Sequence, residues 1–104
     1  MPEKIYWVYL LNCVNGSYYT GYTTDLIRRY HEHRTGSDKC KYTRSFKPLG
    51  VVQCWAISGT QSMAMKIEKF IKGLSRREKE ELILRPECLF VWYDSCDETL
   101  KDYV

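Results

Sequence analysis

Two short apolar runs separated by a turn-forming dipeptide open this chain, and they predict a pair of strands. Residues 5–11 are almost entirely aliphatic or aromatic, and residues 17–22 form a second run after Asn15 and Gly16. Two such runs around an Asn-Gly pair are typical of a β-hairpin. The chain is therefore expected to begin its fold with this hairpin.

The length of the hairpin loop decides which side chains share a face of the sheet. A two-residue turn would put Tyr9 and Tyr19 on opposite faces. A three-residue loop ending at a left-handed Gly16 would pair Tyr9 with Gly21 and make the two tyrosines diagonal neighbours, about 7–8 Å apart at their backbones. We expect the three-residue loop, which would leave bare space over Gly21 for a ligand.

The later pattern predicts one more strand and three helices. Residues 51–57 are short, apolar and bounded by glycines, which is typical of a buried strand. Helical periodicity follows in three segments: one capped by Thr23 or Thr24 and ended by Gly36, one over residues 62–72, and one from a capping box at 75–78 to a stop before Pro86.

These elements predict an α+β fold, a small antiparallel three-stranded sheet made of the N-terminal hairpin and one later strand, flanked by three helices. Residues 37–48 are expected to be a basic loop, and residues 89–93 a short strand or a docked tail. The chain has 104 residues, enough for one core. We therefore assign residues 1–86 to one domain and residues 87–104 to an acidic extension that is not a separate domain.

Charge is distributed unevenly along the chain. Residues 1–86 carry fifteen Lys or Arg against eight Asp or Glu, whereas residues 87–104 carry one Lys against five acids. A basic body suits a polyanionic partner, although two solvated helix faces would give the same pattern. The acidic extension is predicted to lie near the basic surface and weaken binding of a polyanion, and a solvated tail is the alternative.

Composition also narrows the compartment and the redox chemistry. No apolar run approaches the roughly 18–20 residues of a membrane span, and no signal-peptide pattern precedes the first strand. We expect a cytoplasmic protein without a membrane partner. The five cysteines contain no C-x-x-C pair, which favours reduced thiols. A zinc site of Cys40 with His31 or His33 is an alternative, although its spacing matches no known pattern.

Three polar residues break the apolar stripes of the predicted helices. Arg29 and His33 lie one turn apart on the inward stripe of the first helix, and Glu68 falls within the apolar stripe of the second. A charge that faces inward is costly unless it is paired or metal-bound. An Arg29–Glu68 ion pair would explain two of them. Convergence with Tyr9 and Tyr19 in one cleft at the sheet face favours a functional site instead.

The ordered combination of these motifs resembles the GIY-YIG nuclease domain family, within it the small stand-alone bacterial branch of UPF0213-like proteins. WVYLL at 7–11 and YTG at 19–21 stand where the family has its two name-giving motifs. The family's helix arginine falls on Arg29, its histidine on His33 and its metal-binding glutamate on Glu68. The order and spacing of the motifs carry the resemblance, because each motif alone is weak.

The resemblance covers about residues 5–85 and has two departures. Trp7 replaces the first glycine of the opening motif, and Tyr22 stands where the repair-nuclease members have a lysine. The missing lysine removes one phosphate contact, which predicts weak activity or a different substrate. Residues 87–104 match no pattern of the family.

The resemblance implies a metal-dependent endonuclease or nickase that cuts phosphodiester bonds in DNA, with a structure-directed role in repair or recombination. Tyr9 would act as the general base or position the water, with its pKa lowered by nearby cations, and Tyr19 would hydrogen-bond into the same network. His33 would relay the proton from Tyr9. Arg29 would hold the scissile phosphate. Glu68 would be the only protein ligand of one Mg²⁺ or Mn²⁺ ion, without any small-molecule cofactor.

A basic segment is expected to contact the phosphate backbone of DNA without reading its sequence. The residues in it that we assign to nucleic-acid binding are Lys39, Lys41, Tyr42, Arg44 and Lys47, with Tyr42 as the candidate for stacking on a base. Two alternatives remain: a nucleic-acid-binding module with the same fold and little or no catalysis, and a protein-interaction domain. The sequence identifies no protein partner.

Overall fold

The structure, a computed structural model, describes residues 4–37 and 40–101, with side chains described as far as residue 95. The strands in these residues are β1 (Lys4–Cys13), β2 (Tyr18–Thr23) and β3 (Pro48–Gly59). They form one antiparallel sheet in the order β2-β1-β3. The predicted α+β class and the three-stranded sheet are confirmed.

The hairpin has the three-residue loop that the sequence predicts. Tyr9 lies opposite Gly21, and Leu11 lies opposite Tyr19. Gly16 has a φ of 82°, a left-handed conformation that glycine adopts without a steric penalty. Tyr9 and Tyr19 therefore share one face of the sheet, with ring centroids 6.4 Å apart.

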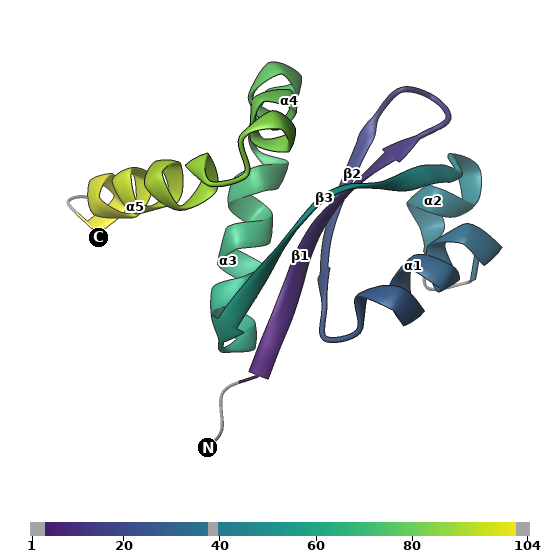
Figure 1. Cartoon of the computed structure of the whole chain (residues 1–104), viewed down its shortest axis with the longest axis horizontal. Helices are drawn as coiled ribbons and strands as arrows, with labels where there is room; N and C mark the ends of the chain where they lie inside the picture. The colour runs from purple at the N-terminus through teal and green to yellow at the C-terminus, as the bar shows by residue number, and fades with distance from the viewer. Residues whose placement is uncertain (1–3, 38–39, 102–104) are drawn as a thin grey trace.

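Helices cover both faces of the sheet (Figure 1). One face carries α1 (Leu26–Thr35) and α2 (Lys41–Ser45). The opposite face carries α3 (Gln61–Lys72), α4 (Arg76–Leu84) and α5 (Cys88–Lys101). The main hydrophobic core lies on this second face, between the sheet and the three helices, and consists of Val8, Leu10, Trp55, Ile57, Ile67, Ile71, Leu82 and Leu89.

The helix ends follow local capping chemistry. The capping box that begins α4 is confirmed, because Ser75 and Glu78 exchange side-chain and backbone hydrogen bonds. Gly36 ends α1 in the left-handed conformation, as predicted. The predicted threonine cap of α1 is wrong. Asp25 is the N-cap, since its carboxylate accepts a 3.1 Å hydrogen bond from the Arg28 backbone N–H, while Thr23 supports the Asp25 backbone.

Three predicted elements differ in the structure. The predicted loop at 37–48 contains the short helix α2. The predicted buried strand at 51–57 is part of the longer edge strand β3, which buries Trp55 and Ile57 and exposes the residues between and after them. Residues 89–93 do not form the strand but belong to the helix α5, and they are docked on the core, the other predicted alternative, because Leu89 is buried there with Trp92 and Tyr93 packed against it.

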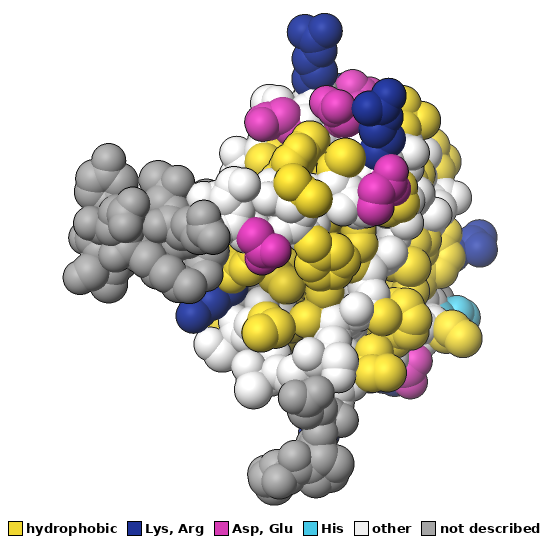
Figure 2. Space-filling view, turned by 60° about the vertical axis from the view of Figure 1, so that its left-hand side comes forward, with side chains coloured by type: hydrophobic (Ala, Val, Ile, Leu, Met, Phe, Trp, Pro, Cys, Tyr) yellow, Lys and Arg dark blue, Asp and Glu magenta, His cyan; other side chains and the backbone are white. Residues whose placement is uncertain are grey.

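The face formed by α3, α4 and α5 carries exposed apolar side chains. Figure 2 shows that such side chains gather on this side of the molecule, between scattered charged groups. The large exposed apolar residues of these helices are Met63, Met65, Leu84, Phe90 and Val91. In residues 4–37 and 40–101, no helix has both the length and the apolar character that a membrane crossing requires.

Candidate active site

A pocket of about 400 Å³ opens at the edge of the sheet beside β2. Its walls come from both strands of the hairpin, from α1 and from α3, and the residues are Tyr9, Tyr19, Gly21, Tyr22, Thr23, Arg28, Arg29, Glu32 and Glu68. Four of the five predicted catalytic residues line it. The fifth, His33, is completely buried behind the pocket.

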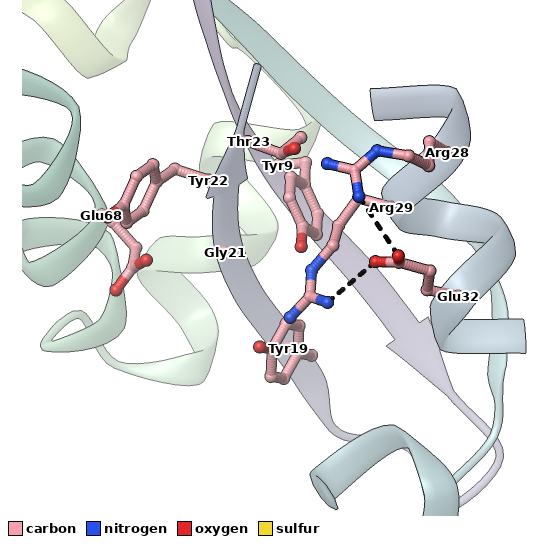
Figure 3. A pocket seen from close by; sticks show the side chains of 9 residues that line it. All are labelled: Tyr9, Tyr19, Gly21, Tyr22, Thr23, Arg28, Arg29, Glu32 and Glu68. Carbon is pink, nitrogen blue, oxygen red and sulfur yellow. Dashed lines mark hydrogen bonds and ion pairs between the residues drawn. The ribbon is translucent and has the colours of Figure 1, made fainter. Parts of the chain in front are cut away.

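The predicted residues reach the pocket from two faces of the sheet. Tyr9, Tyr19 and Arg29 lie on the face that α1 covers, whereas Glu68 projects from α3 on the other face (Figure 3). The β2 ribbon passes between these two groups. Convergence on a single sheet face, which periodicity predicts, is therefore wrong for Glu68. Its carboxylate reaches the pocket because β2 is an edge strand with no further strand beyond it in the sheet order.

Gly21 lets the Tyr9 ring extend across β2. A Cβ atom on Gly21 would lie 2.5 Å from the Tyr9 hydroxyl oxygen and 3.2 Å from the Tyr19 ring. Such a separation is far below van der Waals contact. The bare space expected over Gly21 is thus filled by Tyr9 itself, and the pocket lies beyond the ring.

The Tyr9 hydroxyl begins a buried chain of hydrogen bonds. Its oxygen is 2.9 Å from His33 Nε2, and His33 Nδ1 is 2.7 Å from the Thr43 hydroxyl oxygen. The Thr43 hydroxyl in turn lies 3.5 Å from the Cys40 carbonyl oxygen. Tyr9, His33 and Thr43 are each at most 1% exposed. The chain therefore runs from the pocket wall into the interior, between α1 and α2.

Burial sets the protonation states of the side chains in this row of hydrogen bonds. It lowers the pKa of His33 to about 4, with the Arg29 charge acting in the same direction, so the imidazole is neutral at neutral pH. Burial, with a smaller contribution from Tyr19, raises the pKa of Tyr9, and the neighbouring Arg29 offsets only part of that increase. Arg29 therefore lowers the Tyr9 pKa as expected, but desolvation outweighs its effect, and the neutral His33 adds no positive charge.

The charged groups of the pocket form ion pairs that the sequence analysis did not include. Glu32 bridges two arginines: its carboxylate oxygens lie 3.0 Å from Arg29 Nη1 and 3.2 Å from Arg28 Nη1. Glu68 pairs with Lys72 at 3.3 Å. The suggested Arg29–Glu68 ion pair is therefore not how the structure compensates these charges. Glu32 could have been found from its spacing, because residues three and four apart on a helix are neighbours.

Tyr19 packs the aromatic side of the site. Its ring centroid is 4.8 Å from that of His33 and 5.8 Å from that of Tyr42. Both contacts hold the histidine ring and α2 against the hairpin. Phe46 continues the aromatic row, 5.2 Å from Tyr42.

The predicted nucleic-acid-binding residues surround α2, next to this aromatic row. Lys41, Tyr42 and Arg44 belong to the helix, and Lys47 follows it; all four are exposed. Lys39 lies outside the described residues. Tyr42 is only 38% exposed, and its hydroxyl bonds to Ser17. It is therefore partly enclosed, unlike the stacking residue in an open loop that the sequence suggests.

Cys40 is buried at the start of α2, although the sequence predicts a loop there. The described cysteines Cys13, Cys40, Cys54 and Cys88 carry free thiols. In the part of the chain that the structure describes, no three His, Cys, Asp or Glu side chains gather as a metal site. The zinc alternative thus has no ligand set there.

Comparison with known proteins places this chain in a family. A model of the GIY-YIG catalytic domain matches residues 5–81. The chain is 46% identical over 78 residues to the UPF0213 protein BH0048 of Halalkalibacterium halodurans, covering 75% of this chain and 81% of that protein. It is 47% identical over 75 residues to UPF0213 protein VNG_2274C of Halobacterium salinarum, covering 72% and 95%.

The solution NMR structure of the BH0048 protein, described there as from Bacillus halodurans, is also similar. It shares 46% identity, covers 76% of this chain and 82% of its own, and has a TM-score of 0.47. The chain belongs to the GIY-YIG family, whose catalytic domain is that of a nuclease, and its close relatives are UPF0213 proteins. The resemblance inferred from the motifs is confirmed.

Proposed function

We propose that this chain is a divalent-metal-dependent endonuclease or nickase that hydrolyses phosphodiester bonds in DNA. The pocket at the edge of β2 carries the proposal, because it combines Tyr9 and its histidine partner with two arginines and an accessible carboxylate. Hydrolysis by water needs a proton acceptor, a group that holds the phosphate and positive charge near the leaving oxygen. Membership of a nuclease family supports the same reaction class.

Arg29 and Arg28 are the groups that would hold the scissile phosphate. A planar guanidinium matches two phosphate oxygens, and the two arginines lie side by side on one wall of the pocket. Their present partner is the Glu32 carboxylate. An incoming phosphate would exchange with this carboxylate, so Glu32 holds both guanidinium groups in position until substrate binds.

Tyr9 would pass a proton on without becoming a free tyrosinate. Its raised pKa disfavours the anion, but its oxygen can accept a proton from water while its own proton moves to His33 Nε2. Arg29 is one cause of the low His33 pKa. A phosphate bound to Arg29 would offset that positive charge and raise the His33 pKa, which makes His33 a better acceptor when substrate is present.

Glu68 fits the role of ligand to one Mg²⁺ or Mn²⁺ ion. Its side chain is 15% exposed and faces the pocket, and its ion-pair partner among the described residues is the solvent-exposed Lys72. Magnesium accepts one carboxylate together with water and phosphate oxygens. When bound, the ion would supply charge stabilisation at the phosphate. The contribution of the chain is a single carboxylate across the pocket from the arginines.

DNA would reach the pocket along the basic residues beside it. Lys41, Arg44 and Lys47 are exposed around α2, on the same side of the sheet as the arginines, and Lys39 precedes them in the sequence. They suit backbone contacts without sequence readout. Structure-directed cleavage in repair or recombination, in the cytoplasm, is the finer part of the proposal, since the described elements form one small unit around one sheet.

A nucleic-acid-binding module with little catalysis is the second candidate. Two observations favour it: the raised pKa of Tyr9, and the position of Tyr22 where repair nucleases have a lysine. Tyr22 lines the pocket and accepts a 3.1 Å hydrogen bond from Gln61, so it supports α3 without adding positive charge.

Nicking of supercoiled plasmid in Mg²⁺ or Mn²⁺ separates the two candidates. We expect the purified protein to nick, chelation to abolish nicking, and Tyr9→Phe and Glu68→Ala each to lower the rate about 100-fold or more, because each removes a group from the chemistry. Tyr6→Phe, on the other face of the sheet, and Glu81→Ala, exposed on α4, are matched controls that should nick normally. Nicking that survives both site substitutions would contradict the mechanism. Metal-independent binding without nicking would favour the module.

A further inference from the structure

The buried hydrogen-bond chain ends on a residue that the proposed chemistry does not yet use. Thr43 lies on the five-residue helix α2 and is completely buried. Its hydroxyl oxygen is 2.7 Å from Nδ1 of His33, on the opposite side of the ring from Tyr9. Both ring nitrogens of His33 are thus occupied, one by each hydroxyl.

A neutral imidazole carries one N–H, so the chain has two possible arrangements. In the first, Nδ1–H donates to Thr43, and Nε2 accepts the hydrogen of the Tyr9 hydroxyl. In the second, Nε2–H donates to the Tyr9 oxygen, and the Thr43 hydroxyl donates to Nδ1. Only the first leaves Nε2 with a lone pair that can take a proton from Tyr9.

The surroundings of the two hydroxyls favour the first arrangement. There, the Thr43 hydroxyl donates to the Cys40 carbonyl at 3.5 Å, one helical turn earlier. In the second, Tyr9 receives hydrogen bonds from both His33 and Arg29, and its own hydrogen would have to leave the chain, because a guanidinium only donates. The first arrangement therefore keeps all three hydrogens inside the hydrogen-bond chain, whereas the second turns the Tyr9 hydrogen toward the pocket and leaves the Cys40 carbonyl without the Thr43 hydroxyl.

We propose that Thr43 is a positioning residue, whose hydroxyl holds His33 as the Nδ1–H tautomer and so directs the Nε2 lone pair at the Tyr9 hydroxyl. The catalytic meaning of this inference rests on the proposed function, but the tautomer is a property of the folded chain. In the proton transfer, the water proton goes to the Tyr9 oxygen, the Tyr9 proton goes to Nε2, and the hydroxide bonds to phosphorus as the bond between phosphorus and the 3′-oxygen breaks. Thr43 accepts from Nδ1–H throughout. The 3′-oxygen takes a proton from solvent, and the imidazolium returns its extra proton to solvent through the Tyr9 hydroxyl.

The tautomer can be measured directly by long-range ¹⁵N–¹H NMR of the labelled protein at neutral pH. The chain has two histidines, and the exposed His31 serves as an internal reference. We expect wild-type His33 to show the pattern of Nδ1–H. Thr43→Val, which keeps the shape but not the hydroxyl, should lower the ratio of Nδ1–H to Nε2–H about five- to ten-fold, the equivalent of one lost hydrogen bond. Thr43→Ser should restore it.

An Nε2–H pattern in the wild type would overturn the inference, whether or not any variant folds. So would an unchanged tautomer ratio in folded Thr43→Val. If the protein nicks, Thr43→Val should lower the turnover rate about ten-fold at unchanged DNA affinity, with Thr43→Ser near wild type and the exposed Thr35→Val as control. Unchanged turnover in Thr43→Val would also count against it. A wild type that fails to nick contradicts the proposed function and leaves the tautomer result to stand separately.

Discussion

At the scale of single residues, His33 shows how burial and hydrogen bonding set a protonation state. The ring is completely enclosed, with hydroxyls against both nitrogens and the Arg29 guanidinium nearby. Hydroxyls can serve a neutral imidazole from both sides, because each can donate or accept. A charged imidazolium would lose its hydration there and face the Arg29 charge, and the Glu32 carboxylate offsets only part of this cost, so the pKa falls.

The low pKa of His33 makes stability depend on pH. The folded pKa is about 4 against an ordinary value of 6.5, so the unfolded chain binds more protons between these values, and the free energy of unfolding falls as pH decreases from 6.5 to 4. We expect a loss of about 2–3 kcal/mol from this group. Urea unfolding of wild type and His33→Gln at several pH values measures it. The variant, although less stable at pH 7, should lose less on acidification, and equal losses would contradict the assignment.

At the scale of elements, the parts that the sequence predicts correctly are those set by neighbours in the chain. The hairpin register follows from Gly16, and the start of α4 follows from Ser75 and Glu78, because a turn and a capping box close within a few residues. The edge position of β3 depends instead on the sheet order, and the position of α2 depends on packing against α1. Neither position can be predicted from a local sequence pattern.

The same distinction applies to the site. Helical spacing identifies Arg29, His33 and Glu68 as polar residues on inward stripes, and register pairs Tyr9 with Gly21. Thr43 carried no signal, because its role exists only once α2 packs beside α1. The sequence also does not predict that Glu68 comes from the far face of the sheet. Helix periodicity gives the direction of a side chain relative to its own helix, but not the face of the sheet that the helix covers.

The first turn of α5 belongs to the core, and this can be tested. Leu89 is completely buried in the cluster with Leu82, whereas Val91, two residues later, is 66% exposed. We expect Leu89→Ala to lower the free energy of unfolding by about 2–5 kcal/mol and Val91→Ala to change it by less than about 0.5 kcal/mol. Denaturant titration gives both numbers. If both substitutions changed the free energy of unfolding by equally small amounts, α5 would not contribute to the core. The predicted domain boundary at residue 86, which stays a prediction, would then gain support.

At the scale of the whole molecule, both sides of the sheet carry exposed lysines and arginines, but the pocket arginines lie on the α1–α2 side. Large exposed apolar side chains also occur on both sides, including Ile27 on α1 and Val91 on α5. The helix α5 extends away from α1 and α2 (Figure 1). The start of the acidic extension packs instead on α3 and α4, where Tyr93 contacts Phe70, and these helices also carry exposed lysines and arginines. The predicted effect of the extension on polyanion binding stays a prediction.

Salt dependence of DNA binding should report which cations contact phosphate. Each contact releases about one counterion, so Lys41→Ala and Lys47→Ala should each reduce the slope of log affinity against log salt by about one. Arg85→Ala, exposed at the end of α4, is the control and should leave the slope unchanged. Fluorescence anisotropy across a salt series measures all three. Slopes that respond equally to the control would place DNA elsewhere on the molecule.

The division of the pocket across the edge of β2 has a consequence for the newborn chain. Tyr9, Tyr19, Arg29 and His33 leave the ribosome before α3, and Glu68 can join them only after the helix has crossed to the far side of the completed sheet. A translation intermediate that contains the hairpin and α1 therefore has Glu32 but lacks Glu68, the proposed ligand of the ion. Cleavage of DNA would therefore begin only after α3 has been synthesised and has packed on the side of the sheet opposite α1.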